Sequence, residues 1–204
     1  MKFRLVLPAL ILLSAFGAFA ETTNDLTDVE IQGRQLARQI LEQKPATNYS
    51  QTGVLKIRDA KGTHNIPLRF QTSITPTIWS TTYETTPESN QVSLVVIHET
   101  GKANQYKIYA GPPLALTLPK FLTGNETMIP FAGSDFWIAD LGLEFFHWPE
   151  QKILKKEFRR NCSCMVLEST NPNPSPDGYS RVESWIDEKS YGIEIGRASC
   201  RERV

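Results

Sequence analysis

The distribution of hydrophobic residues near the start of the chain predicts one helix. Between Asn24 and Gln43 they recur at spacings close to three, four and seven, which place them on one helix face, and the opposite face is polar. Pro45 marks the end of this pattern, because proline cannot continue a helix. A helix of this length is marginal alone in water, so a later part of the chain should bury its hydrophobic face. That face comprises Val29, Leu36, Ala37, Ile40 and Leu41.

Beyond the helix, hydrophobic and polar residues alternate, and this period of two predicts β-strands. Leu55 and Ile57 alternate with charged residues in the first run. After a turn, Ile66, Leu68 and Phe70 occupy every second position of the next run, so the hairpin has one hydrophobic face that covers a core or a cavity. Further runs of this kind occupy residues 77–84, 91–99 and 105–110. A serial antiparallel sheet is the simplest topology for this succession.

The alternation stops in the middle of the chain. Residues 111–131 contain four prolines, too many for a long helix or a central strand. The central segment, from Gly133 to Trp148, is hydrophobic on nearly all sides, and Ser134 and Pro149 are suited to begin and end a buried helix there. Strands resume at residues 152–160, 164–170 and 179–187. We expect a further strand beside the last of these, because a sheet of this size should not expose a bare edge.

The first twenty residues look separate from the folded part of the chain. Residues 1–20 combine two basic residues, a short hydrophobic run and the small-residue pattern Ala18-Phe19-Ala20, which predicts a secretory signal peptide cleaved after Ala20. A transmembrane anchor is the alternative, but the run is shorter than the roughly 20 residues that span a bilayer. No cysteine near Glu21 offers a site for a lipid anchor, so we expect a soluble periplasmic protein.

Residues 194–204 resemble the translation of a sequencing adapter, and a genuine basic tail is the alternative. We expect them to have no packed role, and residues 21–193 then form a single, truncated domain. Acidic residues slightly outnumber basic ones in that domain, which argues against a basic surface for nucleic acid. Nucleic acid is therefore not an expected partner.

Residues that could carry catalysis form no recognisable motif. The sequence has no nucleophile elbow, no phosphate-binding loop and no metal triad, so we expect neither an enzyme nor a cofactor. Cys162 and Cys164 leave three options open: a strained disulfide, two buried thiols or a metal site. The histidines that would complete a metal site are scattered along the chain.

Several short motifs, together with the order of predicted elements, resemble one family. The motifs are Gly133-Ser134-Asp135-Phe136 with Asp140-Leu141, the run Cys164 to Ser169, and Trp185-Ile186-Asp187. Over residues 26–193 the chain resembles the bacterial outer-membrane lipoprotein-sorting proteins of LolA-like fold, although Trp137-Ile138-Ala139 interrupts the usual pattern after Phe136. The resemblance implies an α+β fold in which helices cap the concave face of a curved antiparallel β-sheet, an unclosed barrel. It also implies that C-terminal strands are missing here, and that an apolar cavity holds acyl chains in transit across the periplasm.

Three classes of function follow from these observations. The first is a periplasmic carrier or chaperone that binds the acyl chains of lipoproteins or lipids for transfer towards the outer membrane. The second is a non-catalytic module that binds envelope proteins and has a filled core. The third is a secreted enzyme of unrecognised type. An acyl chain of about 14 methylenes costs roughly 11 kcal/mol to expose to water, so a carrier must enclose it.

Inward-facing side chains are the candidate ligand contacts, although the same residue types also form an ordinary core. On the sheet they are Leu55, Ile57, Ile66, Leu68, Phe70 and Trp79, and on the first helix Val29, Leu36 and Ile40. In the central segment they are Phe136, Trp137, Phe145 and Phe146. We expect the first helix and the central segment to close over the concave face and to move when an acyl chain enters.

Overall fold

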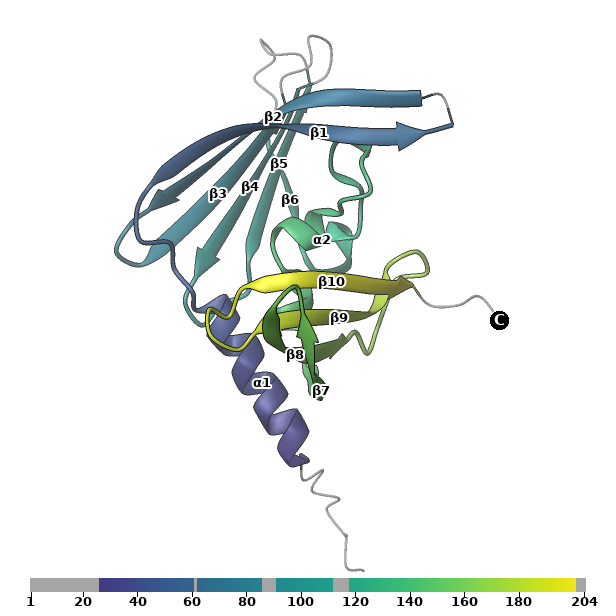
Figure 1. Ribbon diagram of the computed structural model, residues 1–204. Coiled ribbons are helices and arrows are strands. Elements are labelled where there is room, and N and C mark those ends of the chain that lie inside the picture. The colour runs from purple at the N-terminus through teal and green to yellow at the C-terminus, as the bar shows by residue number, and fades with distance from the viewer. Residues whose placement is uncertain (1–25, 61, 86–90, 112–117, 201–204) are drawn as a thin grey trace, which may run out of the picture.

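The computed structural model describes residues 26–60, 62–85, 91–111 and 118–200, so the predicted signal peptide lies outside it (Figure 1). Two antiparallel sheets and one long helix dominate the fold. Within these residues no helix is both long and hydrophobic enough to cross a membrane.

The first sheet has six strands in chain order, each antiparallel to the next. They are β1 (Tyr49–Asp59), β2 (Gly62–Ile74), β3 (Ile78–Thr85), β4 (Gln91–Glu99), β5 (Gln105–Gly111) and β6 (Lys120–Leu122). Phe70 of β2 lies opposite Tyr83 of β3, which in turn lies opposite Leu94 of β4. Side chains at such paired positions share one face of the sheet, so the alternation in the sequence becomes one continuous hydrophobic face. The predicted serial topology is confirmed.

The second sheet has four strands in the order β10-β9-β8-β7. They are β7 (Glu150–Arg159), β8 (Cys162–Thr170), β9 (Tyr179–Asp187) and β10 (Ile193–Cys200). The backbone of β10 pairs with β9 from Ile193 to Cys200. This pairing supplies the strand expected beside β9, and the expectation that residues 194–200 pack against nothing is therefore wrong. The adapter origin of residues 194–204 stays a prediction.

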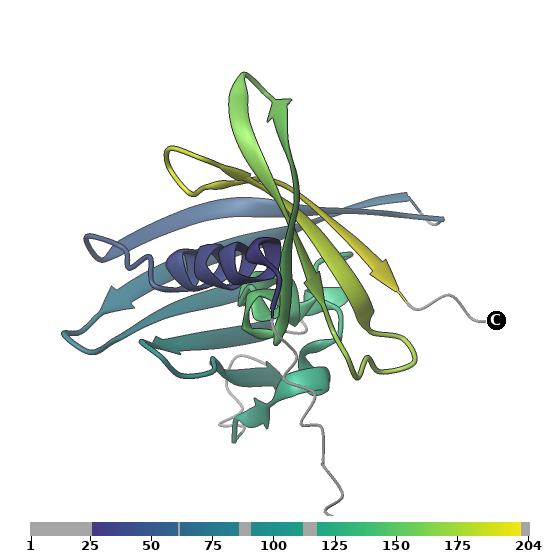
Figure 2. The same ribbon diagram turned by 90° about the horizontal axis from the view of Figure 1, so that it is seen from below.

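Helix α1 (Asp28–Leu41) begins with a cap in which the backbone N–H of Thr27 donates to the Glu30 carboxylate at 2.7 Å. Its hydrophobic face packs against β7 and β8 of the second sheet, as Figure 2 shows from below, and not over the first sheet as expected. Val29, expected on the buried face, is 38% exposed, because that face begins to contact the sheet only one turn later.

Gly33 brings α1 and β7 close together. A β-carbon at this position would lie 2.7 Å from the backbone of Gln151 and Lys152. The contact between helix and strand therefore requires a residue without a side chain.

The central segment is not the single helix predicted from its composition. It contains the end of the 3-10 helix η2 (Phe131–Gly133), the short helix α2 (Ile138–Leu141) and the 3-10 helix η3 (Glu144–His147). Leu143 has a φ of 53°, a left-handed conformation that interrupts the helix after one turn. Ser134 bonds locally to Phe131 and Phe136 at the end of η2 and begins no helix, whereas the Trp137 N–H donates to the Asp140 carboxylate at the start of α2.

The two main hydrophobic cores of the described residues lie on different sheets. One lies between α1, η3 and the second sheet, and includes Leu36, Phe146 and Leu167. The other lies between the first sheet and the segment containing η2 and α2, and includes Leu94 and Ile138. Because the helical segment reaches only part of the first sheet, the remaining strands face a groove.

Candidate functional site

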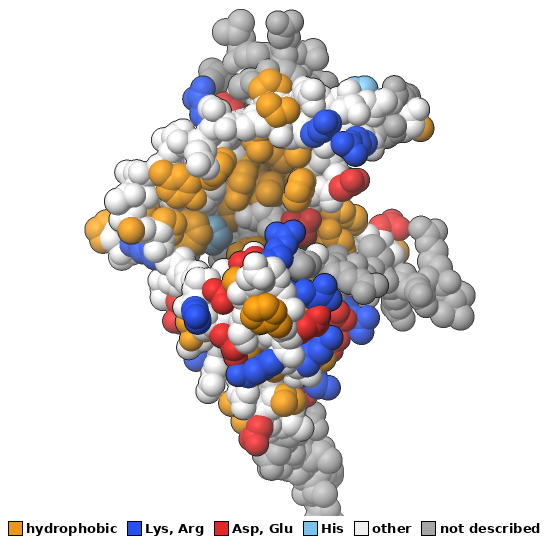
Figure 3. Space-filling view, viewed as in Figure 1, with side chains coloured by type: hydrophobic (Ala, Val, Ile, Leu, Met, Phe, Trp, Pro, Cys, Tyr) orange, Lys and Arg blue, Asp and Glu red, His pale blue; other side chains and the backbone are white. Residues whose placement is uncertain are grey.

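The candidate site is the concave face of β1, β2 and β3. The register places a set of large hydrophobic side chains on this one face, and all of them are only half-buried. They are Leu55, Ile57, Ile66, Leu68, Phe70, Trp79 and Tyr83. Figure 3 shows hydrophobic side chains gathered in the hollow between the first sheet and the β9–β10 hairpin.

Incomplete cover explains why these side chains are only half-buried. On the neighbouring strands, Leu94, Val96 and Tyr106 lie beneath η2 and α2, and each is at most 1% exposed. On β1 to β3, Leu55, Leu68 and Tyr83 pack against the same cluster but stay partly exposed, so the cover over these strands is incomplete. A contiguous hydrophobic surface left open on a soluble protein marks a binding site.

A row of aromatic rings crosses this face. Tyr49 and Phe70 lie 5.7 Å apart between ring centroids, Phe70 and Tyr83 lie 6.4 Å apart, and the row ends on Phe131 of η2. The Tyr83 hydroxyl donates to the carbonyl oxygen of Leu141 at 3.3 Å. Burial raises the pKa of Tyr83 to about 12, so the ring stays neutral. The row therefore offers a continuous uncharged surface from the edge strand to the central segment.

Two cavities lie at the end of the concave face. The larger, about 480 Å³, lies between α1, the β4–β5 turn and residues 146–151. The smaller, about 220 Å³, is bounded by α1, the link between α2 and η3, and residues 191–193. Leu41, Trp79 and His98 line both cavities, and the Trp79 ring stacks on His98 with centroids 3.7 Å apart. Because Trp79 also belongs to the concave face, these cavities extend the groove.

His98 is neutral in this position. Burial lowers its pKa to about 4, and a hydrogen bond with Asn104 only partly opposes that effect. The wall that His98 shares with Trp79 is therefore uncharged at neutral pH.

Replacing His98 should change how stability depends on pH. The unfolded histidine has a pKa near 6.5, so the stabilising contribution of neutral His98 is present above about pH 6.5 and is lost as the pH falls towards 4. After discounting for partial exposure, we expect wild type to lose about 1 kcal/mol more free energy of unfolding than His98→Gln between about pH 7 and about pH 5. Urea unfolding at both pH values measures this, and equal losses would contradict it.

Polar contacts hold the central segment in place from two sides. The Tyr106 hydroxyl donates to the Glu144 carboxylate at 2.7 Å, and burial raises the pKa of Glu144. The Asn104 side chain donates to the carbonyl oxygen of Gly142 at 2.6 Å. From β7, the Gln151 amide donates to two carbonyl oxygens of the segment, both at 2.9 Å. These contacts tie the central segment to both sheets, and its movement on acyl-chain entry stays a prediction.

Two solved structures share this fold. A domain described as an outer membrane lipoprotein-sorting protein, from Vibrio parahaemolyticus, is 18% identical with a TM-score of 0.64, and the match covers 84% of this chain and 73% of that one. A DUF1329 family protein from Desulfovibrio piger is 15% identical with a TM-score of 0.61, over 86% of this chain and 75% of that one. No curated protein matches the chain by sequence. The predicted LolA-like fold, an unclosed and mostly antiparallel sheet with few helices, is confirmed.

A family model described as an uncharacterized protein matches residues 80–193, more than half of the 204-residue chain. The chain belongs to this family. The matched region runs from β3 to the start of β10. It therefore includes Trp79's neighbours on β3, the central segment and most of the second sheet, whereas α1, β1 and β2 lie outside the match.

The structure separates the predicted ligand contacts into two groups. The six on the sheet, from Leu55 to Trp79, lie together on the concave face. The aromatic residues of the central segment lie elsewhere, although Phe146 also lines the larger cavity together with Trp79. Phe145 and Phe146 are buried in the core beside α1, Trp137 packs on Tyr179 at 5.0 Å, and Phe136 is 55% exposed.

The first helix also contributes differently from expectation. Leu36 and Ile40 are buried in the core with the second sheet, and Ile40 also borders the smaller cavity. Sequence reasoning missed Tyr49, Tyr83 and His98 as members of the site. The alternation within β3 and β4 contains the signal for the last two, because Trp79 and Tyr83 share a strand face and His98 pairs with Trp79.

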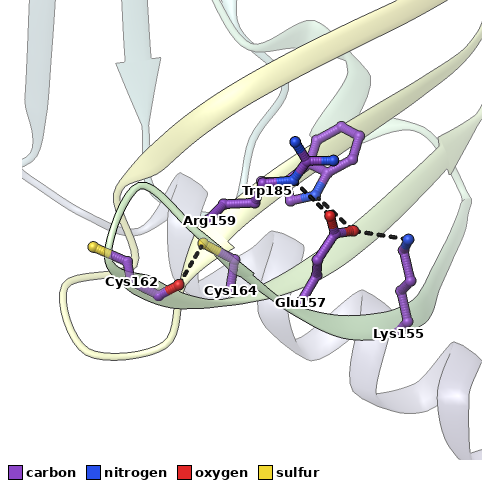
Figure 4. A network of polar contacts seen from close by, with 6 residues as sticks. All are labelled: Lys155, Glu157, Arg159, Cys162, Cys164 and Trp185. Atoms are coloured by element: carbon purple, nitrogen blue, oxygen red, sulfur yellow. Dashed lines mark hydrogen bonds and ion pairs between the residues drawn. The ribbon is translucent and has the colours of Figure 1, made fainter.

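The cysteines lie on a different surface. Cys162 and Cys164 are both free, and the Cys164 thiol lies 3.8 Å from the carbonyl oxygen of Cys162 (Figure 4). Cys164 packs with Trp185 on the face of the second sheet opposite to α1. In the described parts of the chain, no three potential metal ligands gather. The thiols are therefore not part of the groove.

A charged cluster lies beside them, around Glu157. Its carboxylate accepts from Lys155 at 2.7 Å, Arg159 at 2.5 Å and the Trp185 indole at 3.3 Å (Figure 4). These donors, Lys155 first, lower the pKa of Glu157 to about 2. Each charged group of this cluster has a partner within it, and the cluster lies apart from the concave face.

Proposed function

We propose that this protein is a periplasmic carrier or chaperone that binds the acyl chains of lipoproteins or lipids on the concave face and passes them towards the outer membrane. The observation that carries the proposal is the part of that face formed by β1 to β3, where large hydrophobic side chains of neighbouring strands stay partly exposed. The likeness in fold to a domain described as a lipoprotein-sorting protein supports it. The predicted signal peptide supports export to the periplasm.

The chemistry of the face fits this role without catalysis. Exposing an acyl chain to water costs about 0.8 kcal/mol per methylene, so a carrier needs aliphatic and aromatic surface and no reactive group. Leu68 and Phe70 supply such surface in the middle of the groove. The protein is accordingly proposed to act by binding alone and not as an enzyme.

The alternative is an envelope protein-interaction module whose sheet is filled by its own side chains. The covered half of the first sheet, around Leu94 and Tyr106, has that character. The half formed by β1 to β3 has it to a lesser degree, because its hydrophobic side chains stay partly exposed even where they pack against that core. This difference favours the carrier.

Native mass spectrometry of the exported protein tests the proposal. We expect lipid to remain bound after purification without detergent, and the delipidated protein to bind a fluorescent fatty-acyl probe saturably with one site. A folded protein that carries no lipid and does not bind the probe would support the interaction module instead. Circular dichroism on the same sample establishes that it is folded.

A further inference from the structure

The larger cavity has a cationic rim on α1. Arg34 and Arg38 both line it, and they are one helical turn apart, so their side chains are neighbours on the helix surface. Neither guanidinium forms a hydrogen bond or an ion pair with another described residue. Glu30, one turn earlier, attracts Arg34 only through space.

The other charged groups at this cavity are largely occupied. Lys102 pairs with Glu99 at 2.6 Å. Lys44 donates to the carbonyl oxygens of Thr75 and Pro76 at 2.7 and 3.1 Å. Glu42 is the one remaining acidic side chain that lines the cavity in the described structure. The two arginines therefore leave the rim with an excess of positive charge.

The inner wall of the same cavity is aromatic. Trp79, Phe146 and Trp148 line it together with His98, which burial keeps neutral. The smaller cavity, which meets it at Leu41, Trp79 and His98, is bounded mainly by hydrophobic side chains. A ligand that fits this arrangement is anionic at one end and hydrophobic at the other.

We propose that the larger cavity binds the anionic headgroup of an acyl lipid, with Arg34 and Arg38 holding its phosphate. The acyl chain then runs past Leu41 and Trp79 onto the concave face. A guanidinium donates two parallel hydrogen bonds to phosphate oxygens, and about 480 Å³ lies within the ordinary range of ligand sites. This inference rests on the proposed acyl binding and adds a preference for the headgroup.

Short-chain lipids below their micellar concentration test the headgroup preference. Dihexanoyl phosphatidylglycerol and dihexanoyl phosphatidylcholine have the same chains but anionic and zwitterionic headgroups. Titration calorimetry should give at least tenfold tighter binding of the anionic lipid to wild type. The Arg34→Gln/Arg38→Gln variant should lose this preference and bind the two lipids with equal affinity. Arg69→Gln, an arginine on the outer face of β2, is the matched control and should keep the preference.

The outcomes distinguish this inference from the proposed function. If wild type binds both lipids equally, or if the double variant keeps the preference, the headgroup site is wrong while acyl binding stands. If wild type binds neither lipid, the proposed function fails together with the inference. Inorganic phosphate is the third ligand: binding as tight as the anionic lipid, and lost in the double variant, would mean a site for a free anion and would overturn the lipid assignment.

Discussion

Replacing Phe70 with glutamate should weaken the binding of a fluorescent acyl probe more than tenfold. Phe70 lies in the middle of the aromatic row, between Tyr49 and Tyr83. A carboxylate there must lose its water when an acyl chain covers it, and burying a charge without a partner costs several kcal/mol. In the free protein the position is partly exposed, so water can still reach the carboxylate and the variant should fold.

Gln71→Glu provides the matched control. Gln71 is the next residue on β2, it is exposed, and its side chain lies on the opposite face of the sheet. The substitution adds the same charge, and an exposed change of this kind alters stability by no more than about 0.5 kcal/mol. We expect wild-type probe binding from this variant. If folded Phe70→Glu binds the probe as well as Gln71→Glu does, the concave face of β1 to β3 is not the acyl site.

Replacing Gly33 with valine should lower the free energy of unfolding by about 3 kcal/mol, at the upper end of the usual cost of overpacking. Its β-carbon would lie 2.7 Å from the backbone of Gln151 and Lys152, and neither backbone can yield without moving β7. The helix must shift away from the second sheet, which weakens the contacts of Leu36 and Ile40 in the core. Urea unfolding followed by circular dichroism measures the loss.

Gln35→Val is the control that separates the cost of the clash at Gly33 from the cost of placing a valine in a helix. Gln35 lies two residues away on the exposed side of α1, so the variant carries the same β-branched side chain without the clash. We expect it to cost only about 0.5 kcal/mol, the difference in helix propensity. Equal stability of the two variants would show that α1 does not need the close approach at Gly33.

The strands could be predicted because their signal is local. Alternation placed Ile66, Leu68 and Phe70 on one face, and the antiparallel register then brought that face together with Trp79. Periodicity also identified Leu36 and Ile40 as the buried side of α1. It could not say against what they are buried, since a hydrophobic face packs equally well on either sheet.

The errors concern features that depend on distant parts of the chain. The central segment is hydrophobic enough for a helix, but Leu143 adopts a left-handed conformation, and Tyr106 and Gln151, from two different sheets, bond to the segment. Such contacts leave no periodic signal in the sequence. For the same reason Phe145, expected at the ligand, lies in a core, and Phe146 lies in that core and also lines the larger cavity.

The two cores share no buried residue, and this has a consequence for the range of ligands. The larger cavity takes Arg38 from the helix packed on the second sheet and Trp79 from the first sheet. We expect the distance between these walls to change by a small rotation of one sheet against the other about α2, whose Ile138 belongs to one core and whose Ala139 belongs to the other. A bulkier ligand would be accommodated by widening the groove and not by repacking it, so a single sequence can serve cargoes of different size.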